Sequence, residues 1–305
     1  MNLRHLAVFV EVVRCGTMSG AAEVLFLSQP AISKTISRLE EQFDTILFDR
    51  IGNRLIITDS GRKLYRHAIQ LLDQEAQMKR QMKGQREMLR IGGTLTVGST
   101  ILTQIIQTFQ SEYPRARLST KITNTKEIED LLLQSQLDIA LVEGVVKSPL
   151  LVVTPMIEDH LVMACTTTHP LAGRDTVYLD ELSDYPFHMR EPGSGTRELF
   201  ENFMMRRGHD VNIVYESTCP ISIRSAIEDF NLISVLSFRL VEEGLSSGRD
   251  YAFSPEGEDW SRNFSLVYHR DKMLTPLLQA FIQHIGRLRD TPFPAHLIKG
   301  KILIS

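Results

Sequence analysis

The most constraining feature of the sequence is a pair of short helical patterns near the N-terminus, separated by a tight break. Thr17 precedes the first pattern, and Ser28 follows the break and precedes the second. Serine and threonine are favoured N-caps because their oxygens accept a hydrogen bond from a free N–H in the first helical turn. Pro30 lies in the first turn of the second pattern, where a missing N–H costs nothing. With an upstream helix that Asn2 can cap, this order predicts a helix-turn-helix from about Thr17 to Arg38.

The third helix of this region has two chemically different faces. Its apolar residues recur at helical spacing and are expected to face inward; they are Ala31, Ile32, Ile36, Leu39 and Phe43. Its polar residues gather on another face; they are Gln29, Ser33, Lys34, Ser37 and Arg38. Such side chains read base edges in the DNA major groove, and a helix N-terminus offers N–H groups to phosphate. The pattern favours a DNA-reading helix, although an ordinary solvated helix face carries a similar mixture.

Two short β-like runs follow, at 46–50 and 54–58, with the turn signal Gly52-Asn53 between them. They predict a small hairpin. Arg50, Asn53 and Arg54 lie at its tip, within reach of a flanking phosphate or the minor groove of a DNA bound by the preceding helix.

A long helical pattern runs from residue 59 to about residue 86. Its apolar positions are alternately four and three residues apart, with one polar interruption; they are Leu64, Ala68, Leu71, Glu75, Met78 and Met82. A heptad stripe of this kind pairs with a second helix. The sequence therefore predicts a homodimer formed through this helix.

From residue 89 onward, strands and helices alternate. Expected strands at 89–93, 118–123 and 137–142 enclose helices at 101–113 and 126–134, which is typical of a parallel sheet. A second α/β stretch follows, with strands at 187–190, 213–217 and 232–236 and helices at 195–208 and 221–230. A strand at 264–269 and a helix at 276–288 are expected to return to the first half. The pattern leaves open whether residues 292–305 dock on the core or on a partner.

Charge is distributed unevenly along the chain. Residues 1–90 carry four more Lys and Arg than Asp and Glu, and the remainder carries seven more acidic than basic residues. Residues 1–58 hold six of each sign, so a DNA-binding surface there must depend on the placement of a few groups. No apolar run is long enough to span a bilayer, and the N-terminus lacks the layout of a signal peptide. We therefore expect a cytoplasmic protein that does not associate with membranes.

The three cysteines are far apart and form no CxxC pair. They are Cys15, Cys165 and Cys219. This spacing argues against a zinc site or a disulfide framework and for a reducing compartment. Cys219, beside a proline at an expected strand-to-helix turn, is the best candidate for a redox-active thiol, whereas the simpler interpretation is three idle thiols.

At this point the sequence resembles a known family. The run GTMSGAAEVLFLSQPAISKTISRLEEQFDTILFDR, followed by RLIITDSGRKLYRHA, resembles the N-terminal domain of LysR-type transcriptional regulators. The resemblance implies an α/β protein with an all-α, winged N-terminal domain. It further implies a winged helix-turn-helix over 1–58, a linker helix over 59–88, and a two-subdomain effector-binding domain over 89–305 that is similar to periplasmic binding proteins. Subdomain I is expected at about 89–163 and 266–290, and subdomain II at about 164–265.

The resemblance also implies partners. The third helix is the recognition helix, the hairpin is the wing, and double-stranded promoter DNA is bound by a homotetramer that responds to a small-molecule effector; RNA polymerase is a further partner that it suggests. The expected DNA-binding residues are Thr17, Ser19, Ser28, Gln29, Pro30, Ser33, Lys34, Ser37, Arg38, Arg50, Asn53 and Arg54.

Several hydroxyl groups and an arginine follow expected strands in the C-terminal half. Open parallel sheets bind ligands at the carboxyl ends of their strands, and helix N-termini there favour anions. The segment REPGSGTR at 190–197 resembles one that faces the effector in some members of the family. Together with Cys219 at another such turn, the resemblance places effector contacts at Thr94, Thr96, Thr125, Glu143, Arg190, Ser194 and Thr196. A small anionic metabolite is the expected effector, while the simpler interpretation is that the hydroxyls cap helices and that Arg190 pairs with Glu191.

The sequence offers little support for an enzyme. Ser194 lies between two glycines, but Pro192 replaces the first glycine of the G-x-S-x-G nucleophile motif. The histidines show no metal-ligand spacing, so neither a metal nor another cofactor is expected. The alternative function is a small-molecule or redox sensor whose N-terminal helices serve only for dimerisation.

Overall fold

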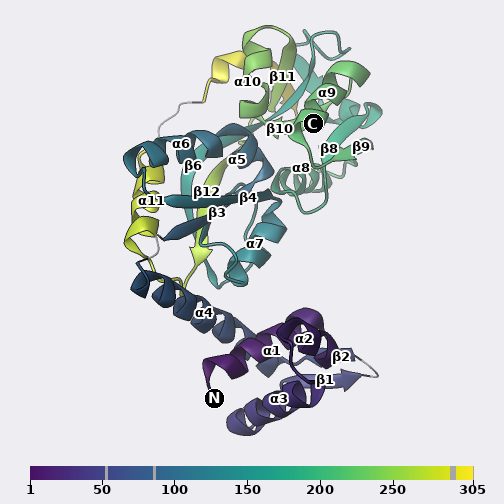
Figure 1. Ribbon diagram of the computed structural model, residues 1–305. Coiled ribbons are helices and arrows are strands. Elements are labelled where there is room, and N and C mark those ends of the chain that lie inside the picture. The colour runs from purple at the N-terminus through teal and green to yellow at the C-terminus, as the bar shows by residue number, and fades with distance from the viewer. Residues whose placement is uncertain (52–53, 85–86, 289–292, 305) are drawn as a thin grey trace. The chain divides into compact units, whose positions relative to one another are not determined.

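The computed structural model describes residues 1–51, 54–84, 87–288 and 293–304. The chain forms two compact units (Figure 1). Met1–Glu87 makes up most of the first, and Met88–Leu132 with Gln136–Ser305 makes up the second.

The N-terminal unit contains three short helices, a hairpin and a long helix (Figure 1). They are α1 (Leu3–Cys15), α2 (Met18–Leu25), α3 (Gln29–Phe43), β1 (Phe48–Ile51), β2 (Arg54–Ile57) and α4 (Asp59–Met82). Asn2, Thr17 and Ser28 cap the first three helices through their side-chain oxygens, as the sequence predicts. Gly16 ends α1 with φ 67°, a backbone conformation that glycine adopts without strain.

The core of this unit is built mainly from α1, α3 and the first half of α4. Ile32, Ile36 and Leu39 of α3 are buried in it. The expected inward positions of Ala31 and Phe43 are wrong, because both side chains are exposed. They lie near the two ends of the helix, where a periodic pattern extends beyond the surface that the neighbouring helices cover.

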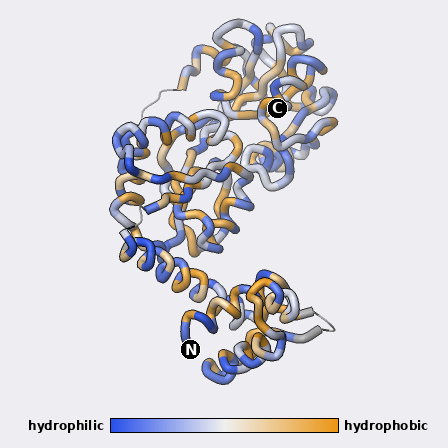
Figure 2. Tube along the Cα trace, in the orientation of Figure 1, coloured by the Kyte–Doolittle hydropathy of each residue, from blue (hydrophilic) through white to orange (hydrophobic). Residues whose placement is uncertain are grey.

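The apolar stripe of α4 has a buried first part and an exposed second part. Ala68 is fully buried in the unit's own core, whereas Leu71, Met78 and Met82 are exposed. Hydrophilic and hydrophobic turns alternate along this helix in Figure 2. The part of the stripe that is available to a second chain therefore begins at Leu71.

The first lobe of the C-terminal unit is an α/β arrangement. It contains β3 (Met88–Thr94), α5 (Leu95–Thr100), α6 (Leu102–Glu112), β4 (Arg117–Thr123), α7 (Thr125–Leu133) and β5 (Ile139–Val142), with α11 (Pro276–Gly286) returning from the end of the chain. Strands β4, β3 and β5 are parallel, as predicted. The short helix α5 was not expected from the sequence; β3 extends through Thr94 and leads directly into it.

Two long antiparallel strands, β6 (Leu151–Thr166) and β12 (Ser261–His269), join the first lobe to the second. The first part of β6 pairs with β12, and its last part pairs with β10 and β11. Strand β6 was missed because it follows a loop and carries polar residues at irregular intervals. It passes from one lobe into the other within a single strand.

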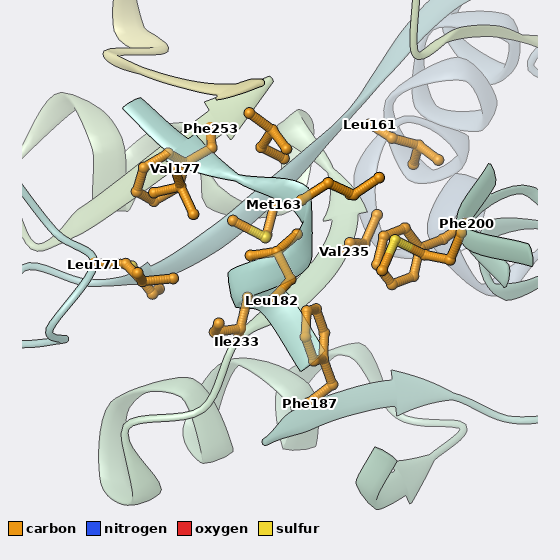
Figure 3. Close-up of a cluster of buried hydrophobic side chains, with 14 of the residues drawn as sticks. Leu161, Met163, Leu171, Val177, Leu182, Phe187, Phe200, Ile233, Val235 and Phe253 are labelled. Carbon is orange, nitrogen blue, oxygen red and sulfur yellow. The ribbon is translucent and has the colours of Figure 1, made fainter. Parts of the chain in front are cut away.

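The second lobe completes the unit (Figure 1). Its elements are β7 (Thr176–Tyr178), β8 (Phe187–Arg190), α8 (Gly195–Met205), β9 (Ile213–Ser217), α9 (Pro220–Phe230), β10 (Ser234–Ser237), α10 (Phe238–Ser246), β11 (Asp250–Pro255) and β13 (Gly300–Leu303), with 3-10 turns at Leu179–Asp184 and Ala295–Leu297. Leu161, Met163, Phe187, Val235 and Phe253 belong to its main apolar core (Figure 3).

The C-terminal segment docks on this second lobe. Strand β13 runs parallel to both β11 and β7, and Ile302 is fully buried. Phe293 stacks on His160, with ring centroids 3.9 Å apart. The segment is therefore part of the core of its own chain.

Candidate functional site

The polar face of α3 has no side-chain partners among the described residues. Gln29, Lys34, Ser37 and Arg38 are exposed and Ser33 is half-buried. None of these five side chains makes a hydrogen bond or ion pair within the part of the chain that the structure describes. Other cations of the same unit are paired internally; the pairs are Arg14–Glu11, Arg62–Asp59 and Lys79–Glu75. The donors of the α3 face are thus free to bind an external partner.

The other expected DNA-binding residues on these helices divide by their contacts. The hydroxyl oxygens of Thr17 and Ser28 accept hydrogen bonds from the N–H three residues later, at 3.1 and 3.4 Å. Ser19 and Pro30 are exposed at the starts of α2 and α3. Thr17 and Ser28 therefore hold the two helix ends in place, whatever else they contact.

The hairpin has the expected register, with Arg50 opposite Leu55 and Ile51 opposite Arg54. Asn53 lies outside the described residues. A DNA contact from Arg50, Asn53 or Arg54 stays a prediction.

In the second unit, seven of the eight expected effector contacts are buried. Thr94, Thr96, Thr125, Glu143, Arg190, Ser194 and Thr196 are each 5% exposed or less, whereas Cys219 is exposed. The structure adds Arg262, whose Nη1 donates to the Thr196 hydroxyl at 2.8 Å. We call Thr94, Thr96, Thr125, Glu143, Ser194, Thr196 and Arg262 the buried polar cluster.

The cluster joins the two lobes of this unit. The Thr96 hydroxyl hydrogen-bonds Glu143 within the first lobe, and Glu143 interacts electrostatically with Arg262 and Arg190. Thr125 lies against Gly144, close enough that a Cβ there would stand 2.5 Å from its hydroxyl oxygen. The ends of β3 and β5 and the starts of α7 and α8 thus contribute to one polar interior, at the strand ends where the sequence predicts it.

The hydroxyls at the helix starts are not caps. Thr94 and Ser194 are the N-cap residues of α5 and α8, but neither accepts a capping hydrogen bond. At α7, the capping oxygen belongs to Asn124 and not to Thr125. The hydroxyl oxygens of Thr94, Thr125 and Ser194 are buried with no partner within the described residues. The simpler interpretation of these positions is therefore wrong.

Two charged groups of the cluster are also incompletely paired. Glu143 Oε2 and Arg262 Nη2 are buried without a partner among the described residues. Burial raises the pKa of Glu143, and the nearby cations Arg262 and Arg190 only partly oppose this. The environment thus favours the protonated form of Glu143 more than water does.

Arg190 and Arg262 hold different partners. Arg190 Nε and Nη2 donate to the Glu191 carboxylate at 2.8 and 3.1 Å, as the simpler interpretation of the sequence suggests. Arg262 Nε donates to Asp159 at 2.7 Å. Asp159 is fully buried and also accepts from the Ser237 hydroxyl at 2.6 Å. Sequence reasoning missed Arg262 because its partners lie 66 and 103 residues away along the chain.

The three thiols differ in their burial. Cys165 is buried in the second lobe, where burial raises its pKa to about 12. Cys15 belongs to the N-terminal unit, and Cys219 is exposed at the start of α9. In the part of the chain that is described, no group of His, Cys, Asp and Glu residues is arranged to hold a metal ion, and no helix has the length and hydropathy of a membrane span.

The lobes approach closely where Gly195 meets Gly144. A Cβ at residue 195 would stand 2.4 Å from the Gly144 Cα, a distance that only a backbone shift can relieve. We expect Gly195→Ala to lower the free energy of unfolding by about 1–3 kcal/mol, the usual cost of overpacking. Gly286→Ala is the matched control, because its nearest neighbour is a flexible methionine end at 3.7 Å and it is expected to be neutral or stabilising. Urea unfolding of both variants tests this; equal stability would show that the contact is not close in solution.

The N-terminal unit has a helix-turn-helix, a hairpin and a polar helix face that is open to a partner. The same chain carries a two-lobed α/β unit with a polar interior. Together these features define a DNA-binding regulator with an effector-binding domain. Residues 3–62 match the family model described as bacterial regulatory helix-turn-helix protein, lysR family, and residues 83–289 match the LysR substrate binding domain. The chain belongs to the LysR family of transcriptional regulators.

Similar proteins agree with this assignment. The chain is 31% identical over 284 residues to the uncharacterized HTH-type transcriptional regulator YeiE of Escherichia coli, covering 93% of this chain and 97% of YeiE. Full-length OxyR from Pseudomonas aeruginosa has the same fold, with a TM-score of 0.67 at 18% identity over 96% of this chain and 99% of OxyR. The regulatory domain of Synechocystis CcmR, solved in complex with 2-PG, matches 67% of this chain and 98% of that domain with a TM-score of 0.62 at 25% identity.

Proposed function

We propose that this regulator controls its target promoters in response to a small anionic metabolite held by the buried polar cluster. One observation carries the proposal: five buried polar atoms of the cluster have no partner within the described residues. They are Thr94 Oγ1, Thr125 Oγ1, Ser194 Oγ, Glu143 Oε2 and Arg262 Nη2. Buried polar groups are nearly always hydrogen-bonded, so such a concentration indicates a place for a bound molecule.

The chemistry of these atoms favours an anion. Three hydroxyls and one guanidinium N–H can donate, whereas Glu143 Oε2 alone is only an acceptor when ionised. The N-termini of α7 and α8 both lie against Gly144, next to Glu143, and add partial positive charge there. Because its pKa is raised, Glu143 can take up a proton and donate to the anion as well, or it can accept from a ligand that carries its own donor. Both arrangements suit a small oxyanion or carboxylate.

Ser194→Ala tests the proposal because it is expected to preserve or raise stability while it weakens ligand binding. The hydroxyl has no partner among the described residues, so its removal is expected to leave the melting temperature unchanged or to raise it, while a ligand that binds there loses affinity. The measurement is a thermal-shift screen of small carboxylates, sulfur oxyanions and amino-acid derivatives against the original and variant proteins.

Ser237→Ala is the matched control for this experiment. Its hydroxyl accepts from the Arg239 N–H and donates to Asp159, so its removal is expected to destabilise the free protein by about 1–3 kcal/mol. If no anion raises the melting temperature, or if a hit acts equally on Ser194→Ala, the cluster is not the effector site.

For DNA binding, we propose contacts from the free face of α3 and from the hairpin arginines. We assign 1–58 to the DNA-binding domain, 59–88 to the linker helix and 89–305 to the effector-binding domain. The exposed Leu71, Met78 and Met82 support a dimer through the linker helix.

A second exposed apolar surface supports a tetramer. Tyr215 of β9 stacks on Phe230 of α9 with ring centroids 5.5 Å apart, and the two side chains are 48% and 60% exposed on the second lobe. One interface in each unit allows two dimers to close into a homotetramer. Sedimentation of the full-length protein tests this, and contact with RNA polymerase is a further part of the proposal.

A further inference from the structure

A cavity in the C-terminal unit shares no residue with the buried polar cluster. It lies between α8, strands β6 and β10, and the turn from β11 to β12, and its volume is about 550 Å³. Ligand sites of small molecules usually measure about 300–1,000 Å³. We call it the Trp260 pocket; the residues that define it are Leu161, Leu199, Phe200, Phe203, Val235 and Trp260.

The walls of the Trp260 pocket are apolar and partly aromatic. The Trp260 ring meets Phe200 and Phe203 edge to face, with centroids 5.8 and 5.1 Å apart. Leu161, Val235 and Phe200 lie together at one side of the second lobe's core in Figure 3. An aromatic or branched apolar group can pack in such a space because edge-to-face aromatic walls accept a flat ring.

Some polar groups around this pocket have hydrogen-bond or ion-pair partners among the described residues, and others do not. Arg207 pairs with Glu258, and Asp259 accepts from the Ser261 N–H and hydroxyl at 2.7 and 2.5 Å. Arg206 also lines the pocket, and its guanidinium has no hydrogen-bond or ion-pair partner among the described residues. Trp260 Nε1 is likewise buried without a partner among the described residues. The groups left to meet a ligand thus include a cation and an indole N–H donor beside an apolar space, an arrangement that suits a carboxylate.

We propose that the Trp260 pocket is a second small-molecule site, which takes a carboxylate with an aromatic or branched apolar body. This goes beyond the proposed function, since both the pocket and the ligand class differ from those of the buried polar cluster. The two sites share supporting elements. Helix α8 carries Thr196 of the cluster and Phe200 of the pocket, and β12 carries Ser261 next to Arg262. A ligand in the pocket thus contacts the helix and strand that hold the cluster.

Trp260 is the only tryptophan of the chain, so its emission reports directly on this pocket. Titration of the full-length protein with 3-phenylpropanoate is expected to change that emission in a saturable way. Arg206→Gln is expected to weaken this binding about tenfold, the loss of one charge-assisted contact. Binding of the uncharged 3-phenylpropanamide is expected to be weaker and insensitive to Arg206→Gln. Arg115→Gln is the matched control and should bind as the original protein does, because Arg115 is exposed on the first lobe and has no side-chain partner among the described residues.

A second variant guards against binding elsewhere. Leu199→Phe enlarges a partly exposed side chain of the pocket wall and is expected to abolish the emission change without unfolding the protein. The proposal is overturned if calorimetry and emission show no saturable binding of the carboxylate. It is equally overturned if binding survives both Arg206→Gln and Leu199→Phe, or if Ser194→Ala abolishes it while Arg206→Gln does not, since the probe then occupies the buried polar cluster.

Discussion

Replacing Arg38 with alanine is expected to reduce specific DNA binding by about 2–6 kcal/mol, which is at least about 30-fold in Kd. Arg38 is exposed, lies on the polar face of α3, and has no partner to lose within the part of the chain that the structure describes. One good base contact is worth about 1–3 kcal/mol, and a dimer presents the residue twice. A site selected from randomised DNA by the full-length protein, followed by anisotropy titration, provides the measurement. Ser33→Ala, five residues earlier on the polar face of α3, should also weaken binding.

Arg14→Ala is the control, because Arg14 is another arginine of the same unit but pairs with Glu11 on α1. It should bind DNA as the original protein does, and all variants should sediment as the same oligomer. Salt titration separates two roles for Arg38. If it contacts phosphate, the salt slope falls by about two for the dimer; if it reads a base, affinity falls and the slope stays constant. Full binding by both Arg38→Ala and Ser33→Ala would contradict the assignment of α3 as the recognition helix.

The N-terminal unit could be predicted closely because its signals are local. Asn2, Thr17 and Ser28 each cap through an N–H three residues away, and Gly16 ends α1 by its own backbone preference. Helical periodicity alone predicts that the polar side chains of α3 share one face. The exposure of Ala31 and Phe43 could not be foreseen, because it depends on how far the neighbouring helices reach along α3.

The C-terminal unit was predictable at its strand ends and not in its long-range pairs. The hydroxyls of Thr94, Thr125 and Ser194 were identified from strand-to-helix turns, yet their lack of capping bonds appears only in three dimensions. The pairing of β13 also appears only in three dimensions, because its partners β11 and β7 lie some 45 to 125 residues earlier in the chain. Local sequence patterns carry no record of such pairing.

Arg262→Met is expected to have the largest effect on stability, since it removes one partner of a buried ion pair. Arg262 Nε lies 2.7 Å from Asp159 Oδ2, and the Asp159 side chain is fully buried. Breaking such a pair costs about 3–5 kcal/mol when the remaining charge is left in a poorly solvating interior. Because Arg239 Nε stays 3.5 Å from Asp159 Oδ1 and offsets part of that charge, we expect a loss toward the lower end of this range. In a domain of this size the melting temperature should fall by about 6–20 °C. Differential scanning calorimetry of the full-length protein gives the value for the C-terminal unit.

Two further variants show whether the Asp159 charge causes the loss of stability in Arg262→Met. Asp159→Asn added to Arg262→Met removes that charge and should restore part of the lost stability, because Ser237 can still hydrogen-bond the amide. Lys301→Met breaks an exposed ion pair with Glu256 and should cost less than about 1 kcal/mol. If the double variant is less stable than Arg262→Met, the loss comes from packing around residue 262 and not from the Asp159 carboxylate, which in Arg262→Met has Arg239 as its remaining cation. If it recovers, the interior that holds Arg262 beside Thr196 depends on Asp159, and loss of that carboxylate alone should also weaken binding of an anion by the buried polar cluster.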